Sequence, residues 1–159
     1  MARYDVGLAC MNGHGGNSMV SSLPEFNAKF CQECGQPTID HCSECSAAIR
    51  AHCHIEGMLN FAEWEVPSHC YECGRAYPGT QRRSDALAEA IDELDELDTE
   101  ERERLKRSIP DILAEAPKSE TAALRFKKAV GKVGSAGGKV LTNVLSKLAT
   151  DAVKVSLGV

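Results

Sequence analysis

Cysteine pairs spaced as metal knuckles are the strongest constraint on the fold of this chain. Three C-x-x-C pairs occur between residues 31 and 73, and all eight cysteines precede Ala76. Two thiolates in one tight turn can ligate one ion, and two such turns complete a tetrahedral site. Three pairs leave one site half complete. The pairs are Cys31/Cys34, Cys42/Cys45 and Cys70/Cys73.

The stretch "CMNGH" supplies the missing half, because Cys10 and His14 stand four residues apart there. The glycine-rich run "NGHGG" lets the backbone fold tightly around an ion. Pairing the four knuckles in chain order predicts two closed, structural zinc sites. The glycine after "CQEC" and after "CYEC" predicts a left-handed turn at the end of each knuckle. The predicted ligands are Cys10, His14, Cys31 and Cys34 for the first site, and Cys42, Cys45, Cys70 and Cys73 for the second.

Other assignments of the cysteines stay open at this point. The two middle knuckles could bind one ion, and the first and last knuckles could bind the other. This second site would have to close a long loop, from residue 14 to residue 70, which costs more conformational entropy. A site of four cysteines could hold an iron–sulfur cluster, whereas the ribbon-like spacing and the histidine favour zinc. Free buried thiols are the simplest alternative, and disulfides are disfavoured because no secretory signal is present.

A second histidine-containing stretch, "AHCHIEG", includes His52, Cys53 and His54. Because both predicted sites are full, we interpret it as a strand of the second ribbon. Neighbouring residues on a strand point to opposite faces, so His52 and His54 share a face that Cys53 does not. This argues against a catalytic Cys–His couple and leaves a zinc hydrolase as the least favoured alternative. Trp64 and Phe61 are predicted to cover a small core beside the metal rather than to contact a partner or a base.

The knuckle sequences resemble a known family. "YDVGLACMNGH", "FNAKFCQECGQPTIDHCSECSAAIRAHCH" and "PSHCYECGRAYP" are similar to an uncharacterised bacterial family, a domain of unknown function with a double zinc ribbon. The resemblance covers the first half of the chain closely, and the acidic segment and "AALRFKK" after it are also similar. Gly79 stands where a tryptophan usually follows the family's "YP" dipeptide. The resemblance implies zinc binding and implies no reaction.

The net charge of −5 divides into three unlike blocks. Residues 1–83 carry 6 basic and 9 acidic residues, residues 84–117 carry 4 and 12, and residues 118–159 carry 8 and 2. The blocks therefore have net charges of −3, −8 and +6, which suggests separate parts. We predict an α+β fold with a double zinc ribbon of short β-hairpins at 1–80, an acidic helical hairpin at 84–117, and a basic amphipathic helix at 118–159.

Helical periodicity runs through the second half of the chain. Ser84 is the predicted N-cap of an acidic amphipathic helix. Asp98 and Glu101 predict a second, short helix that starts with a capping box. Ser119 is predicted to cap a long last helix that ends at about Ser156 and has one apolar stripe. The stripe consists of Phe126, Val130, Val133, Gly137, Leu141, Val144, Leu148, Ala152 and Val155.

The middle of this last segment reads "GKVGSAGG", and each glycine in a helix costs roughly 1 kcal/mol relative to alanine. Gly134 and Gly138 could form a notch for a second helix, the segment could be two helices with a hinge, or it could be a cationic helix lying on a membrane. The simplest alternative places the basic tail against the acidic helices of its own chain or of another copy, because opposite charges attract.

No pattern in the sequence demands catalysis, since a Walker motif, a nucleophile elbow and an HExxH motif are all absent. We predict a non-enzymatic zinc-binding adaptor, with the ribbons for recognition and residues 118–159 for homo-oligomerisation or docking to a protein partner. A membrane-acting effector that uses the cationic helix is the first alternative. A nucleic-acid-binding ribbon is the second, and the net charge of −3 on residues 1–83 disfavours it.

The chain has neither a signal peptide nor an apolar stretch of about 18 residues. We therefore expect a cytoplasmic protein, with a peripheral membrane location as the alternative if the basic tail binds lipid. Thiols stay reduced in the cytoplasm, which suits metal ligation.

Overall fold

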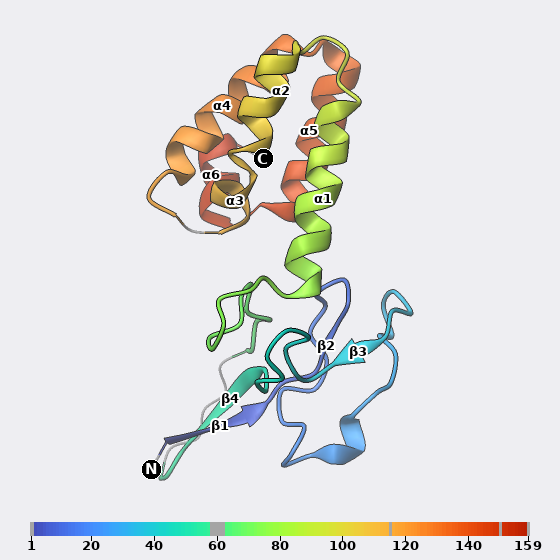
Figure 1. Ribbon diagram of the computed structural model, residues 1–159, viewed down its shortest axis with the longest axis vertical. Helices are drawn as coiled ribbons and strands as arrows, with labels where there is room; N and C mark the ends of the chain where they lie inside the picture. Colours follow the sequence, from blue (N-terminus) through green and yellow to red (C-terminus); the bar gives the residue numbers. More distant parts are fainter. Residues whose placement is uncertain (1, 58–62, 115, 150, 159) are drawn as a thin grey trace. The chain divides into compact units, whose positions relative to one another are not determined.

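The computed structural model describes residues 2–57, 63–114, 116–149 and 151–158 (Figure 1). The chain folds into two compact units, which we call the knuckle unit, Met1–Gln81, and the helical unit, Arg82–Val159. Strands occur in the first unit, and the second unit is helical. The α+β class with small N-terminal hairpins and C-terminal helices is confirmed.

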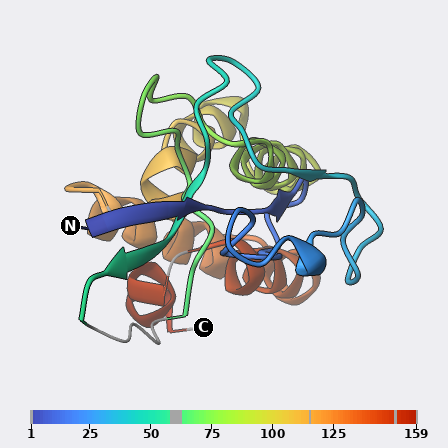
Figure 2. The ribbon, with the colours of Figure 1, turned by 90° about the horizontal axis from the view of Figure 1, so that it is seen from below.

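Two small antiparallel sheets occur in the described part of the knuckle unit. In one, β1 (Ala2–Val6) pairs with β4 (Arg50–Ile55), and these strands lie side by side in Figures 1 and 2. In the other, β2 (Ala9–Cys10) pairs with β3 (Thr38–Ile39). A short 3-10 helix, η1 (Pro24–Phe26), lies in the connection between β2 and β3.

The strand predicted for "AHCHIEG" is present as β4. In the register of this sheet, Tyr4 is the partner of Cys53 and Arg3 is the partner of His54. His52 and His54 therefore share one face of β4, as the alternation of a strand predicts.

The three C-x-x-C knuckles share one backbone hydrogen-bond pattern. The N–H of the first cysteine donates to the carbonyl five residues later, and the N–H four residues later donates back to the first cysteine's carbonyl. That fourth residue has a positive φ in each knuckle, +69° at Gly35, +60° at Ser46 and +70° at Gly74. The left-handed turn predicted after "CQEC" and "CYEC" is confirmed, and Ser46 adopts it although it has a side chain.

A small cluster forms the core of the described part of the knuckle unit, and Trp64 packs against it. The indole Nε1 donates to the carbonyl of Arg50 at 3.2 Å. A Cβ at Gly7 would lie 2.4 Å from the Trp64 ring, so the glycine lets the ring lie against the backbone. The core interpretation of Trp64 is confirmed, while Phe61 lies outside the described residues. The cluster consists of Ala9, Cys42, Ile49, Cys70 and Tyr77.

Helix α1 (Pro78–Asp92) begins before Ser84, so the prediction that Ser84 is its N-cap is wrong. Proline suits the first position of a helix because its φ is already helical. The carbonyl of Tyr77 accepts the N–H groups of Thr80 and Gln81 and so begins the first turn. A Cβ at Gly79 would lie 2.4 Å from the Cα of Gly13. Gly79 therefore allows the first turn to approach the loop between Cys10 and His14.

Over the residues that the structure describes, five further helices follow α1. They are α2 (Thr99–Lys106), α3 (Ile109–Leu113), α4 (Ser119–Lys132), α5 (Ser135–Leu148) and α6 (Asp151–Leu157). The predicted capping box of α2 is present, because the N–H of Glu101 donates to Asp98 Oδ1 at 2.8 Å and the N–H of Asp98 donates to Glu101 Oε2 at 3.1 Å. No helix in the described part of the chain combines the length and the apolar composition that crossing a bilayer requires.

The segment predicted as one long amphipathic helix is divided into α4, α5 and α6. Between α4 and α5 the N–H of Gly138 donates to the carbonyl of Val133 at 2.9 Å. A Cβ at Gly138 would lie 3.1 Å from the carbonyl oxygen of Val130. This glycine therefore allows the tight turn between α4 and α5. After the second break the register changes, because Val153 is buried whereas Val155, placed on the predicted stripe, is 82% exposed.

The start of α4 also differs from the prediction, because Lys118 and not Ser119 occupies the N-cap position. The hydroxyl of Ser119 donates instead to the carbonyl of Asp111 at 2.8 Å. It also accepts the N–H of Ala116 at 2.9 Å. Ser119 thus ties the preceding loop to the helix start.

Acidic and basic segments share one hydrophobic core in the helical unit. Leu87 and Ile91 come from the block predicted as an acidic hairpin, and Phe126 and Leu141 come from the block predicted as a basic helix. Lys132 and Glu101 add an ion pair between α4 and α2. The basic tail therefore packs against the acidic helices of its own chain.

Candidate metal centres

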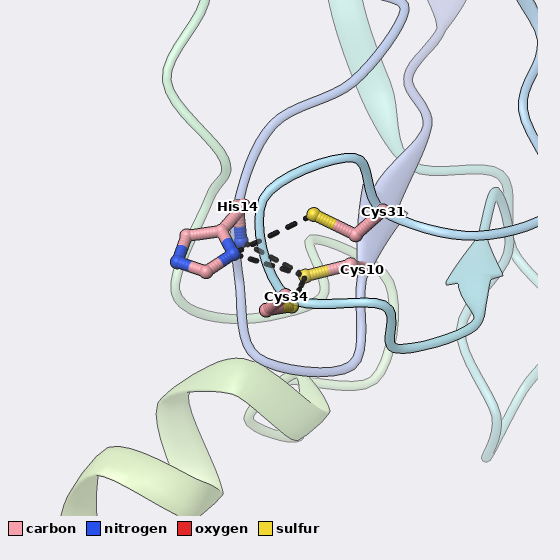
Figure 3. Close-up of side chains that lie close together, drawn as sticks. All are labelled: Cys10, His14, Cys31 and Cys34. Carbon is pink, nitrogen blue, oxygen red and sulfur yellow. Dashed lines mark hydrogen bonds between the residues drawn. The ribbon is translucent and has the colours of Figure 1, made fainter.

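The four side chains of the first predicted site converge on one point (Figure 3). Cys10 Sγ lies 3.7 Å from Cys34 Sγ and 3.6 Å from His14 Nδ1. Cys31 Sγ also lies 3.6 Å from His14 Nδ1. Strand β2 contributes Cys10, the following turn contributes His14, and the second knuckle contributes both other thiols.

The second group consists of four cysteines from the last two knuckles. Cys42 Sγ lies 3.8 Å from Cys73 Sγ, and Cys45 Sγ lies 3.7 Å from Cys70 Sγ. The first cysteine of each knuckle, Cys42 or Cys70, is buried, and the second, Cys45 or Cys73, is exposed. The structure thus brings the eight residues together in chain order, and the other pairing of knuckles does not occur.

These separations are those of ligands around a single tetrahedral ion. With metal–sulfur bonds of about 2.3 Å and a metal–nitrogen bond of about 2.05 Å, tetrahedral geometry gives about 3.8 Å between sulfurs and about 3.6 Å between sulfur and nitrogen. The five separations given above run from 3.6 to 3.8 Å, and all ligand atoms within each group lie within 4.8 Å of one another. A disulfide would place two sulfurs at about 2.05 Å. Each group could therefore bind one metal ion.

Backbone N–H groups in the knuckles favour the thiolate form, which is the form that binds metal. Burial acts to raise the pKa of the Cys31 thiol, but two backbone N–H groups, including that of Cys34, outweigh it and lower this pKa to about 7. At Cys70 the N–H of Cys73 has the largest influence, and the pKa falls to about 6 although burial opposes the shift. Cys10 differs, because burial raises the pKa of its thiol although the sulfur accepts the N–H of His14 at 3.3 Å.

Crowding of the four thiols in the second group opposes the ionisation of one of them. The N–H of Ala47 acts to lower the pKa of Cys45, but burial and the thiols of Cys73, Cys70 and Cys42 raise it to about 12. One thiol of the group is thus easily ionised while its neighbour resists ionisation. A divalent ion at the centre would remove this conflict by compensating the negative charges.

Glu33 lies beside the outer nitrogen of His14. The Nδ1 atom of His14 faces the sulfurs, and the other ring nitrogen points away from them (Figure 3). This Nε2 atom lies 3.9 Å from Glu33 Oε2. A carboxylate there favours a proton on Nε2 and leaves the Nδ1 lone pair for a metal. Glu33 was not predicted from the sequence, although its place inside "CQEC" was the available signal.

An open cavity of about 410 Å³ adjoins the first group. Phe26 and Phe30 contribute to its lining, and they are 65% and 60% exposed. His14 and Glu33 contribute polar groups to the same cavity. This pair of aromatic residues was also not predicted, and their spacing of four residues in "FNAKF" was the available signal.

His52, Cys53 and His54 belong to neither group of potential metal ligands. Over the described ranges, three or more cysteine, histidine or acidic side chains come within metal-binding reach of one another only in the two groups above. This agrees with the interpretation of "HCH" as part of a strand.

Comparison with protein families assigns the chain to a group of bacterial proteins. Residues 3–157 match the family described as "Uncharacterized protein conserved in bacteria (DUF2321)". The chain belongs to the DUF2321 family. The resemblance noted in the knuckle sequences is thus confirmed, and the DUF2321 match also includes the helical unit. Searches of curated proteins and of solved structures gave no match.

Proposed function

We propose that this member of the DUF2321 family is a non-enzymatic zinc-binding adaptor that recognises a protein partner through its knuckle unit. One ligand group has three cysteines and a histidine, and the other has four cysteines. In both groups the ligand atoms are spaced as around a single ion, which suits zinc better than an iron–sulfur cluster. Four protein ligands leave no coordination position for water or substrate, which supports a structural role for both ions. The cytoplasm is the location we propose, because free thiols stay reduced there.

The observation that carries this proposal is the pair of exposed aromatic rings beside the cavity. Phe26 and Phe30 are more than half exposed in a unit that has little apolar area of its own to bury. Aromatic side chains are enriched at protein interfaces, where they act as anchors. The carboxylate of Glu33 gives the same surface a negative edge. A partner segment with an apolar anchor and a neighbouring basic residue fits this chemistry.

Site-specific photocrosslinking in bacterial cells tests the proposal. A photoreactive phenylalanine analogue at Phe30 is expected to capture one defined protein. The same analogue at Tyr71, which is 49% exposed in the same unit, serves as the matched control and is expected not to capture it. The purified partner should bind the zinc-loaded chain directly, and Phe30→Ser should weaken that binding by at least about tenfold. Equal capture at both positions, or binding unaffected by Phe30→Ser, would refute the proposal.

We propose that the helical unit serves oligomerisation or docking. Leu124, Val140 and Val155 support this role because they are large apolar side chains that are more than half exposed. Sedimentation velocity of the full chain is expected to show a dimer or larger species that Val155→Glu or Val140→Glu shifts to monomer. A monomer at all concentrations would leave docking to another protein as the role of this surface.

The membrane-effector alternative has less support, because Phe126, Val133 and Leu141 of the apolar stripe are buried in the helical unit's own core. We expect the full-length chain not to float with liposomes that contain anionic lipids. Flotation that Lys128→Glu reduces would favour the effector instead.

A further inference from the structure

Two histidines on β4 are close enough to share a ligand. His52 and His54 are on the same face of the strand, and their ring centroids lie 4.7 Å apart with 72° between the ring planes. Both side chains are partly exposed. Neither is a ligand of the two four-residue groups.

The carboxylate behind His54 is completely enclosed by protein. Asp5 on β1 has a side chain with 0% exposure, and its Oδ2 lies 3.3 Å from His54 Nε2. The same carboxylate accepts the N–H of Ser21 at 3.0 Å and the hydroxyl of Ser22. Burial acts to raise the pKa of Asp5, but these hydrogen bonds, of which that from Ser22 is the strongest, hold it well below its usual range. Asp5 is therefore a fixed negative charge beside His54.

A fixed carboxylate on one imidazole nitrogen determines what the other nitrogen can do. Asp5 holds the proton on Nε2 of His54, so the lone pair is on Nδ1. A carboxylate in this position also makes the imidazole a stronger ligand. In the described part of the chain, no group donates to or accepts from a ring nitrogen of His52, although its backbone N–H donates to the carbonyl of Ser18 at 3.2 Å. One nitrogen of each ring is thus available.

The separation of the two rings matches that of a chelating pair. With a metal–nitrogen bond of about 2.05 Å, the centre of an imidazole lies about 3.2 Å from the ion. Two such rings at an angle of about 90–100° at the ion then have centres about 4.5–4.9 Å apart. The observed 4.7 Å falls within this range. The centres of the two rings are thus already separated as in a chelating pair.

We propose that His52 and His54, with Asp5 as the positioning residue, form a third metal site that takes an exchangeable divalent transition-metal ion. Imidazole ligands suit Zn²⁺, Ni²⁺, Cu²⁺ and Co²⁺. Two protein ligands leave the remaining coordination positions to water, which makes this site open where the two knuckle sites are closed. Cys53 has no part in it, because it lies on the other face of β4. The inference uses none of the knuckle ligands and does not depend on the adaptor role.

Nickel binding to the zinc-loaded chain tests this proposal. Titration of a tag-free chain that holds two zinc ions with Ni²⁺ is expected to show one nickel ion per chain. Because Ni²⁺ is paramagnetic in such a site, it should broaden the amide NMR signals of β1 and β4 before those of the helical unit. His52→Ala and His54→Gln should each weaken nickel binding by at least about tenfold, since each removes one of two ligands. Asp5→Asn should weaken it by about 10–100-fold, as is typical when a group that orients a ligand is replaced.

Matched variants separate this site from other histidines and from loss of structure. His69→Ala removes an exposed histidine outside the site, and Cys53→Ser removes the thiol between the two ligands, so both should bind nickel as the parent chain does. Retention of two zinc ions shows that a variant is folded. If Asp5→Asn does not fold, nickel binding by the His52→Ala chain decides the outcome. The absence of a nickel ion at millimolar concentration would overturn the proposal. Binding that survives His52→Ala, or broadening that begins away from β1 and β4, would overturn it as well.

Discussion

The two units of this chain are stabilised in different ways. Among the described residues, the helical unit has eighteen buried apolar residues in one cluster, whereas the knuckle unit has a cluster of five, two of which are potential metal ligands. Strands β2 and β3 have two residues each, and an isolated two-stranded pairing is at best marginally stable in water. From this comparison we infer that metal ions bound at the two groups would take the place of a large hydrophobic core in the knuckle unit. Removal of metal should therefore affect one unit and spare the other.

Replacement of a buried ligand is expected to have the largest effect. Cys70→Ser should reduce zinc content from two ions to one per chain and unfold the knuckle unit around the second group, since structural zinc supplies about 10–16 kcal/mol in small domains. Metal analysis and limited proteolysis measure both effects. Cys53→Ser is the control and should retain both ions, because Cys53 belongs to neither group. A Cys70→Ser chain that still binds two ions would contradict the ligand assignment.

A core substitution in the helical unit should give the reverse pattern. Phe126 is completely buried, and Phe126→Ala is expected to lower the free energy of unfolding of the helical unit by about 3–5 kcal/mol. Urea unfolding followed by far-UV circular dichroism measures this change. Both metal ions should stay bound because the knuckle unit does not use this core. Loss of metal from the Phe126→Ala chain under native conditions would show that the units are not independent.

The left-handed residues of the knuckles should give the smallest effects. A Cβ at Gly35 would meet no atom within 4 Å, so Gly35→Ala tests the backbone alone and should destabilise the knuckle unit by about 1–2 kcal/mol. Ser46 already adopts this conformation at φ +60°, so Ser46→Gly should stabilise the unit by up to about 1 kcal/mol. Thermal unfolding of the zinc-loaded variants measures both. If Gly35→Ala raises the melting temperature, the left-handed turn does not contribute to knuckle stability.

Local features of the sequence predicted much of this structure. Ligand spacing predicted the C-x-x-C knuckles, because each is complete within six residues, and pairing the knuckles in chain order then predicted the two groups. The capping box of Asp98 and Glu101 and the left-handed turns at Gly35 and Gly74 are equally local. Each depends on a φ value or on hydrogen bonds between residues close in the chain. Residue types at short, fixed spacings indicate such features directly.

Features that depend on distant neighbours could not be predicted in this way. Gly79 is required by its approach to Gly13, and Asp5 acquires its importance from His54 on another strand. The apolar stripe continues in sequence through 118–159, but the chain turns twice, so Val155 faces solvent while Val153 is buried. Periodicity alone does not reveal such corners, because it describes one helix at a time.

The most direct test of the central claim is hydrogen–deuterium exchange of the full chain before and after a zinc chelator removes both ions. The account predicts that amides of residues 2–57 and 63–81 lose their protection when the metal is removed. Amides of α2, α4 and α5 should keep theirs because their core contains no metal ligand. Protection of the knuckle unit that survives complete removal of metal would contradict the claim. Simultaneous loss of protection in both units would contradict it too.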